Sequence, residues 1–333
     1  MDSLTQIVLG ASVGEAVLGK KVGNKALLWG AVAGTIPDLD VLSNYFLDTV
    51  TAIEVHRGFS HSIFFALLFS PLFGWLVWKL YAKKEASWRD WSLLFFWCLF
   101  THPLLDAFTT WGTQLFWPLE IRLAFQSIFV IDPLYTLPFL IIVLMVLRLK
   151  KSNPRRKQLN RWGLVISSGY LMVTLMLKGF ANHSFAQALE QQKISYSSLS
   201  TRPAPFNTIL WMANVETQDS YLIGEYSFFD TKPISFERIP KNHHLLESFA
   251  SDDKVKRLIR ITEGWYAMTK KGERLYFNDL RFGLLSLDPE ETQFAFSYEL
   301  RHNANGLEFH EVPKFRGDAQ RLLHALWERL RGN

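Results

Sequence analysis

Three short clusters of histidine and aspartate residues stand at the ends of apolar runs in this 333-residue chain. They are Pro37-Asp38-Leu39-Asp40, His56-Arg57-Gly58-Phe59-Ser60-His61-Ser62 and Thr101-His102-Pro103-Leu104-Leu105-Asp106. Polar groups packed so densely beside apolar segments cost free energy unless they have a task. Imidazole and carboxylate groups are ligands for transition metals such as Zn²⁺, Mn²⁺ or Fe. We therefore interpret the three clusters as parts of one metal site.

The spacing within the clusters permits their side chains to face a common ion. His102 and Asp106 are four residues apart, so on a helix they share one face. Pro37 ends the preceding apolar run, so the two aspartates that follow it need not obey helical spacing. Three imidazoles and three carboxylates suit a divalent transition metal, Zn²⁺ or Mn²⁺ in particular, bound as one ion or two. The predicted ligands are Asp38, Asp40, His56, His61, His102 and Asp106.

Three further ionisable residues lie near the clusters or within the apolar runs. Arg57 is either an anchor at a membrane surface or a clamp for a phosphate or carboxylate, which a guanidinium holds through two hydrogen bonds. Glu15 interrupts an apolar run, which favours a catalytic base or a partner of a ligand. Asp132 precedes Pro133 and is either a ligand or a helix N-cap. Taken one at a time, the clusters are also typical of turns and caps.

Six apolar runs carry or separate the clusters, and each predicts a helix. They are Leu4–Leu18, Ala26–Ile36, Ile63–Trp78, Trp91–Leu105, Pro133–Leu147 and Gly163–Leu177. Each is shorter than the roughly 20 residues that span a bilayer, so a soluble bundle of buried helices is one interpretation. Flanking Lys and Arg side chains can lengthen a span, and Trp and Tyr residues gather where the runs end. These two features favour a membrane domain.

The distribution of positive charge predicts the orientation of these helices. Residues 1–180 contain 17 Lys and Arg residues, of which 14 lie in the segments 19–25, 79–89 and 148–161. The positive-inside rule makes these segments cytoplasmic, so all three histidine and aspartate clusters fall on the outer face. This orientation uses Lys and Arg alone, so the convergence is an independent argument for one site. Because the excess charge belongs to the apolar half, we expect no nucleic-acid partner.

The chain after Phe180 has a different pattern. Residues 181–192 continue the last helix, and segments of strand-like composition follow. These segments are Thr208–Val215, Tyr221–Phe229, Gly264–Thr269, Arg274–Phe277, Gln293–Leu300 and Leu307–Val312. Lys270-Lys271-Gly272-Glu273 is typical of a hairpin turn, and Asp318–Arg331 has helical spacing. The predicted fold is mainly α: a polytopic helical membrane domain (1–180) and an extracytoplasmic α+β domain (181–333).

The order of the motifs resembles a known family. The patterns are Pro-Asp-x-Asp at 37–40, His-Arg-Gly-x-Ser-His-Ser at 56–62, Thr-His-x-x-x-Asp at 101–106 and Thr-x-x-Gly-x-x-Leu-x-x-Pro at 109–118. Together they resemble the YdjM-type inner-membrane proteins of bacteria, which are described as metal-dependent hydrolases. The resemblance covers roughly residues 1–150 and implies a bacterial inner-membrane location. Many relatives have a histidine where this chain has Gln6, whose amide oxygen is a weaker ligand.

These observations predict a membrane-bound metal-dependent hydrolase that acts at the outer face. The expected substrate is an ester or phosphoester, including a lipid-linked one, with Arg57 stabilising negative charge and Glu15 acting as a base. A metal-binding or transport protein without hydrolysis is one alternative, although no internal repeat of the kind found in transporters is present in the sequence. A structural or regulatory membrane protein, whose clusters serve as caps and ion pairs, is another. Membrane lipids are the expected partners, and the sequence does not define the oligomeric state.

Overall fold

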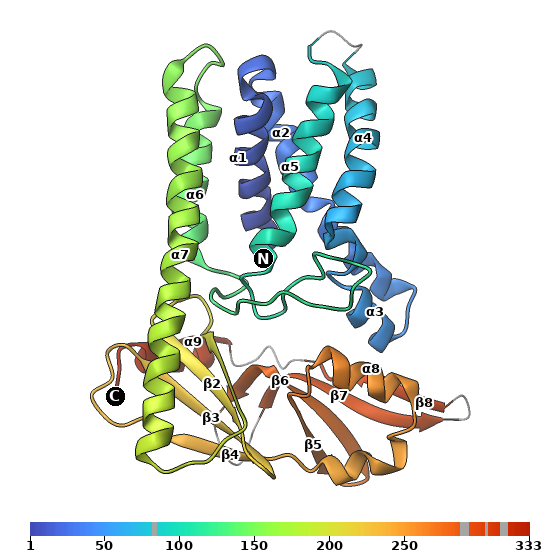
Figure 1. The fold of residues 1–333 in the computed structure, drawn as a ribbon, viewed down its shortest axis with the longest axis vertical. Coiled ribbons are helices and arrows are strands. Elements are labelled where there is room, and N and C mark those ends of the chain that lie inside the picture. Colours follow the sequence, from blue (N-terminus) through green and yellow to red (C-terminus); the bar gives the residue numbers. More distant parts are fainter. Residues whose placement is uncertain (82–84, 287–292, 304–305, 314–318) are drawn as a thin grey trace. The chain divides into compact units, whose positions relative to one another are not determined.

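The computed structural model describes residues 1–81, 85–286, 293–303, 306–313 and 319–333 (Figure 1). The chain forms two compact units. The first comprises Met1–Ser43, Val55–Leu177 and Pro205–Asn207, and the second Asn44–Glu54, Lys178–Ala204 and Thr208–Asn333. Long apolar helices build the first unit, and two antiparallel sheets build the second. The predicted fold class, a helical part followed by an α+β part, is confirmed.

All six predicted apolar runs form helices. They are α1 (Ser3–Val22), α2 (Asn24–Thr35), α4 (Ile63–Leu80), α5 (Trp88–Asp106), α6 (Pro133–Leu147) and α7 (Pro154–Gln191). As predicted, α7 continues past its apolar run to Gln191. Side chains define several helix starts, because Asp2 accepts a hydrogen bond from the Thr5 amide, and Ser87 and Asp90 form a capping box.

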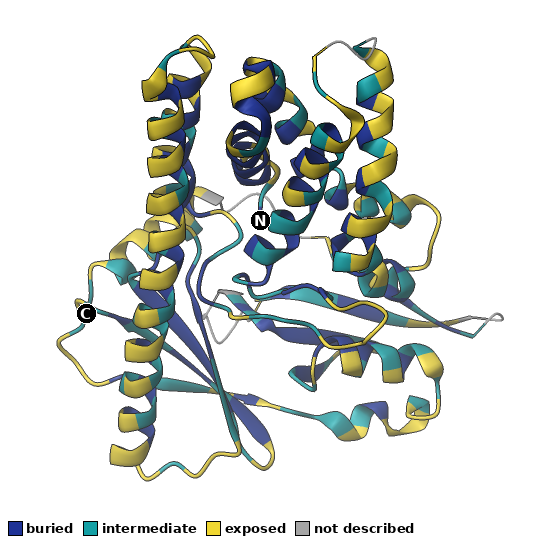
Figure 2. Ribbon diagram, turned by 45° about the horizontal axis from the view of Figure 1, so that its top comes forward, coloured by how far each residue is buried: buried dark blue, intermediate teal, exposed yellow. Residues whose placement is uncertain are grey.

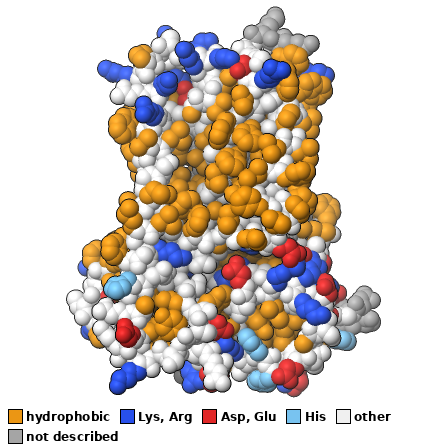
Figure 3. Space-filling view, viewed as in Figure 1, with side chains coloured by type: hydrophobic (Ala, Val, Ile, Leu, Met, Phe, Trp, Pro, Cys, Tyr) orange, Lys and Arg blue, Asp and Glu red, His pale blue; other side chains and the backbone are white. Residues whose placement is uncertain are grey.

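Within the described residues, α4 and α7 are long and apolar enough to cross a membrane. A third span exists if α2 and the 3₁₀ helix η1 (Pro37–Tyr45), which meet at a bend of 41°, count as one. The helix α6 is apolar but has only 15 residues. The outward faces of these helices are exposed (Figure 2), and many of the side chains there are apolar (Figure 3). Such a surface fits contact with lipid rather than water.

The predicted basic segments gather at one end of the helical unit. Lys25 forms an ion pair with Glu85, and Lys151 Nζ donates a 3.4 Å hydrogen bond to the Lys21 carbonyl. Residues from all three segments are therefore neighbours, as the alternation of the helices predicted, and most Lys and Arg side chains of this unit lie at that end (Figure 3). Lys83 and Lys84 lie outside the described residues.

Glycines bring α1 and α2 into direct backbone contact. A Cβ atom added at Gly30 would collide with the Gly10 carbonyl oxygen, and one added at Gly34 would collide with the Gln6 carbonyl oxygen. Only glycine permits so close an approach of two helices. This contact holds the end of α2, and with it the segment that begins at Pro37, against the start of α1.

The second unit contains two four-stranded antiparallel sheets whose strands follow in chain order. The first consists of β1 (Ser198–Pro203), β2 (Leu210–Glu216), β3 (Ser220–Ser227) and β4 (Phe236–Pro240). The second consists of β5 (Tyr266–Lys271), β6 (Arg274–Ser286), β7 (Gln293–Asn303) and β8 (Gly306–Glu311). The six predicted strands are confirmed, with shifts at their ends, whereas β1 and β4 were missed.

Helices and a tight turn complete the second unit. The predicted turn joins β5 to β6 through Gly272, whose φ of 61° suits a hairpin. The helix α9 (Ala319–Leu330) was predicted, although Asp318 at its expected start lies outside the described residues. The helix α8 (Asp253–Ile261) was missed. The remaining elements are α3 (Thr49–Val55), η2 (Phe59–His61) and η3 (His243–Phe249).

Candidate metal centre

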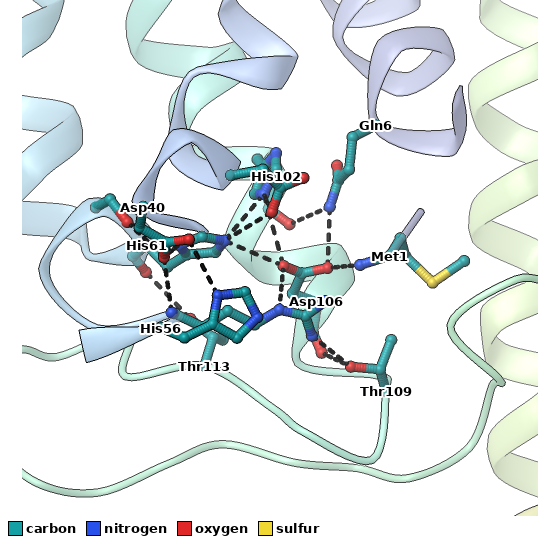
Figure 4. Close-up of polar contacts among 12 residues, drawn as sticks. Met1, Gln6, Asp40, His56, His61, His102, Asp106, Thr109 and Thr113 are labelled. Carbon is teal, nitrogen blue, oxygen red and sulfur yellow. Dashed lines mark hydrogen bonds and ion pairs between the residues drawn. The ribbon is translucent and has the colours of Figure 1, made fainter. Parts of the chain in front are cut away.

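Four of the six predicted ligands converge in the helical unit. One ligand atom from each of Asp38, His61, His102 and Asp106 lies within 4.8 Å of the others. Asp38 comes from η1, His61 from η2, and His102 and Asp106 from the last turns of α5. Figure 4 shows the rings of His61 and His102 and the carboxylate of Asp106 pointing toward one another. Three clusters distant in sequence therefore form one group of donors.

The distances between these donors match the coordination of a small ion. His61 Nε2 lies 3.1 Å from His102 Nε2, 3.4 Å from Asp38 Oδ1 and 3.3 Å from Asp106 Oδ2. His102 Nε2 lies 3.5 Å from each of the same two carboxylate oxygens. Ligands bound at about 2.0–2.1 Å in a tetrahedron lie about 3.3–3.4 Å apart. These five distances, of the six among four donors, are thus close to those of a tetrahedral transition-metal site.

Local structure places each donor. Pro37 follows the end of α2 and opens η1, which carries Asp38. The side chain of Ser62 caps α4 by accepting a hydrogen bond from a backbone amide of its first turn, which sets His61 directly before the helix. The two donors on α5 share one face, as their spacing of four residues predicts.

Hydrogen bonds on the far side of both rings fix their orientation. His102 Nδ1 donates to the Gly34 carbonyl at 2.7 Å, so His102 Nε2 holds a lone pair. His61 Nδ1 faces Asp40 Oδ2 at 3.3 Å and Ser60 Oγ at 3.0 Å, an arrangement that in the neutral ring favours a proton on Nδ1 and a lone pair on Nε2. When both rings are neutral, two lone pairs 3.1 Å apart repel each other unless a cation lies between them. Metal-binding histidines typically have such partners on the second ring nitrogen.

The cluster favours positive charge. Burial lowers the pKa of the His61 imidazole, but the facing carboxylates of Asp106, Asp38 and Asp40 outweigh burial and raise that pKa to about 9. The fully buried Asp106 Oδ2 accepts no well-aligned hydrogen bond from the described residues, although it faces two histidine nitrogens. A buried carboxylate oxygen left in this state is costly. The donor set, with a buried oxygen that accepts no hydrogen bond from the described residues, therefore fits a divalent cation.

Asp40 and His56, also predicted as ligands, lie around the four central residues. Asp40 Oδ1 lies 3.0 Å from His56 Nδ1, and Asp40 Oδ2 accepts hydrogen bonds from the Arg57 amide (2.8 Å) and Ser60 Oγ (3.1 Å). The side chain of His56 is 32% exposed. In this arrangement Asp40 contacts the Nδ1 side of the His61 ring, opposite the other donors, and His56 lies toward solvent.

Arg57 borders the cluster. Its Nε lies 3.3 Å from Asp106 Oδ2, and its Nη1 donates to Thr109 Oγ1 at 2.9 Å. The backbone of Arg57 has a φ of 57°, a left-handed conformation that is uncommon outside glycine. The hydrogen bond from its amide to Asp40 and a 3.0 Å bond from the Gln114 amide to its carbonyl hold it there. Strained backbone of this kind is frequent at functional sites.

Glu15 lies elsewhere in the helical unit. Its carboxylate accepts two hydrogen bonds from Arg156, at 2.7 Å from Nε and 2.5 Å from Nη2, and both side chains are buried. Glu15 follows Gln6 by nine residues, which is about 14 Å along a helix. The structure therefore places Glu15 in an ion pair between α1 and α7. Asp132, for which two roles were open, caps α6 by accepting hydrogen bonds from two backbone amides.

Sequence reasoning missed several contacts of Asp106. Gln6 Nε2 donates to Asp106 Oδ1 at 3.0 Å and to the His102 carbonyl at 3.3 Å, and the Met1 amino group pairs with the same Asp106 oxygen (Figure 4). Gln6 therefore meets the cluster through its amide nitrogen, and its buried Oε1 has no hydrogen-bond partner among the described residues. The signal for Gln6 was the histidine that the family pattern has at its position. Met1 offered no signal, because its contact arises only from the fold.

The fold and site define a helical membrane protein with a buried histidine and aspartate cluster of metal-binding geometry. The chain belongs to the YdjM inner membrane protein family, whose model matches residues 1–181. It is also 36% identical over 101 residues to the inner membrane protein YbcI of Escherichia coli strain K12. That alignment covers 30% of this chain and 57% of YbcI, so the chain spans a little over half the length of this relative. No solved structure matches the chain.

Proposed function

We propose that this protein is a membrane-bound metal-dependent hydrolase of an ester, a phosphoester in particular. The observation that carries the proposal is the close spacing of the four donors, one of which, Asp106 Oδ2, accepts no hydrogen bond from the described residues. Asp38, His61, His102 and Asp106 would hold one divalent ion, and two imidazoles with two carboxylates suit Zn²⁺ or Mn²⁺. When bound, such an ion lowers the pKa of a coordinated water to near neutrality.

The surrounding residues divide the remaining tasks. The Asp38 side chain is 24% exposed, whereas His61, His102 and Asp106 are at most 1% exposed. Water and substrate would therefore approach from the side of Asp38. Arg57 lies against Asp106 and supplies positive charge where an anionic transition state forms. His61 and His102 keep their orientation through the hydrogen bonds on Nδ1.

Exposed apolar side chains next to the site support a lipid-linked substrate. Leu39 is exposed on η1, the element that carries one of the carboxylate donors. Leu119 and Ile121 are exposed on the loop after α5. That loop is tied to the site because Thr113 Oγ1 donates to the His61 carbonyl at 3.2 Å. Exposed apolar side chains on elements that contact a polar centre fit a substrate with a polar headgroup and an apolar tail.

The basic end of the helical unit supports a periplasmic location of the site. Segment 79–89 lies at the opposite ends of α4 and α5 from His61 and Asp106, segment 19–25 contacts it, and segment 148–161 contacts segment 19–25. The positive-inside rule assigns all three to the cytoplasm. The α+β unit would then be extracytoplasmic. A reporter enzyme that functions only outside the cytoplasm should be active when it is fused after Asn333. If only a reporter that functions in the cytoplasm is active there, the proposed orientation is wrong.

Metal content and hydrolysis test the main proposal together. We expect detergent-purified protein to retain about one transition-metal ion per chain, and His61→Ala and Asp106→Ala to lose it. Arg57→Gln should keep the ion, because a guanidinium donates no lone pair, but should lose on the order of 10²-fold in the rate of phosphoester hydrolysis. A metal-loaded protein that hydrolyses no ester in a broad lipid screen would instead be a metal-binding protein.

A further inference from the structure

A second feature of the helical unit lies at the end opposite the metal centre. A groove of about 540 Å³ opens between α4 and the start of α5. Its lining is apolar and consists of Pro71, Leu72, Trp75, Trp78 and Trp88. Trp75 follows His61 by 14 residues, about 20 Å along a helix, so the groove is separate from the cluster. Leu72, Trp75 and Trp88 are exposed despite their apolar surface.

Two cations lie near tryptophan rings that line this groove, and we call these two residues its rim. Lys79 Nζ lies 3.8 Å from the centroid of the Trp75 ring, and the guanidinium carbon of Arg89 lies 5.9 Å from the centroid of Trp88. Neither cation forms an ion pair within the part of the chain that the structure describes. The neighbouring Asp90 is already engaged, at 2.7 Å, by a lysine at the end of α1. Among the described residues, the rim therefore carries positive charge that no carboxylate neutralises.

We propose that this groove binds one anionic phospholipid of the membrane. The acyl chain would lie on the tryptophan surface, and the phosphate would lie between Lys79 and Arg89. Tryptophans with nearby cations are typical of the interface between hydrocarbon and headgroups. A zwitterionic lipid offers the same acyl chain but adds a positive group beside the two cations, so the rim selects for net negative charge. The site is independent of the proposed hydrolysis.

Native mass spectrometry of the detergent-purified full chain tests this assignment. Phosphatidylglycerol and phosphatidylcholine with identical acyl chains are titrated separately. We expect the wild type to bind the first lipid about tenfold more tightly or better. The double variant Lys79→Gln/Arg89→Gln should lose this preference. The double variant Arg155→Gln/Lys157→Gln removes the same charge from two exposed positions on α7 and should keep it.

A groove-filling variant tests the acyl-chain part. Leu72→Trp adds bulk inside the groove and should weaken the binding of both lipids, with the melting temperature as a check on folding. Equal affinity of the wild type for the two lipids would overturn the proposal. So would an unchanged preference in Lys79→Gln/Arg89→Gln, an equal loss in the control variant, or full phosphatidylglycerol binding by Leu72→Trp.

Discussion

Replacing Asp40 by asparagine distinguishes a metal ligand from a residue that orients one. In the structure Asp40 Oδ2 faces His61 Nδ1 at 3.3 Å and accepts hydrogen bonds from the Arg57 amide and Ser60 Oγ. Asparagine keeps the shape and one acceptor oxygen but removes the negative charge behind the His61 ring. The four central donors remain in place. The substitution should therefore weaken metal binding without abolishing it.

The expected loss of metal affinity follows from the position of Asp40, which contacts the donor His61 but is not itself one of the four donors. Loss of such a partner typically lowers metal affinity about 10–100-fold, which is about 1.4–2.7 kcal/mol. His56→Gln is the matched control, because His56 contacts Asp40 Oδ1 at 3.0 Å and is partly exposed. A contact of that kind contributes about 1 kcal/mol or less, so this variant should change affinity less than about fivefold.

The assay is competition for Zn²⁺ between detergent-purified protein and a chelator of known affinity, with Asp106→Asn as the reference for loss of a ligand. If Asp40→Asn loses the ion as completely as Asp106→Asn, Asp40 is a direct ligand and the ion is not centred on the four donors. If Asp40→Asn binds as tightly as the wild type, Asp40 does not orient His61.

Three more predictions concern the rest of the fold. Gly34→Ala forces a methyl group against a backbone oxygen of α1 and should lower the unfolding free energy by about 1–3 kcal/mol, whereas Gly169→Ala, in open space, should not. Glu15→Gln breaks a buried ion pair and should cost about 3–5 kcal/mol while metal affinity per folded chain stays unchanged. Burial lowers the pKa of His243 in the folded state. Below about pH 6.5 the unfolded state therefore binds more protons than the folded state, and the free energy of unfolding decreases as the pH falls. His243→Phe should remove the share of this decrease that the His243 ring causes.

Thermal unfolding in detergent measures the stability change in all three, and the competition assay for Zn²⁺ measures the metal affinity of Glu15→Gln. Equal destabilisation by the two glycine variants would contradict the role of the α1–α2 contact, and a metal loss in Glu15→Gln would connect that residue to the site. For His243, the comparison is the drop in melting temperature between about pH 7.5 and pH 5 with and without the substitution. The His243 ring is shielded from water by its stacking on Tyr266, with ring centroids 4.0 Å apart. Identical drops would mean that the ring is not desolvated.

The helices could be predicted because their signal is local. Apolar runs, prolines and caps such as Ser62 act over one or two turns, so the runs and their ends follow from short stretches of sequence. The strands β1 and β4 were missed for the opposite reason. In Ser198–Pro203, Leu199 is the one aliphatic residue among three hydroxyl residues, an arginine and a proline. This segment becomes a strand by pairing along its whole length with β2, the next strand in the chain, so the reason for its conformation lies in the partner strand and not in its own residues.

The candidate site also has features that local sequence predicts and features that depend on the fold. Residue types and topology predicted that His61, His102 and Asp106 would meet, because all three lie at helix ends on one face. The separation of Asp38 from Asp40 depends on the path of η1, which places one carboxylate beside His102 and the other behind His61. Local sequence contains no information about that path.

The charge of the cluster connects its structure to its proposed role. The cluster contains three carboxylates, from Asp38, Asp40 and Asp106, and two cations, the Arg57 guanidinium and the Met1 amino group, both of which pair with Asp106. With both central imidazoles neutral, the group is net negative in a place where unpaired charge is costly. A single proton on the two rings, which the raised pKa of His61 permits at neutral pH, would cancel that charge, but it would point toward only one or two of the acceptors that face the rings. A bound divalent cation satisfies Asp106 Oδ2 and both lone pairs at once, and this is why we favour a metal centre over a purely structural polar cluster.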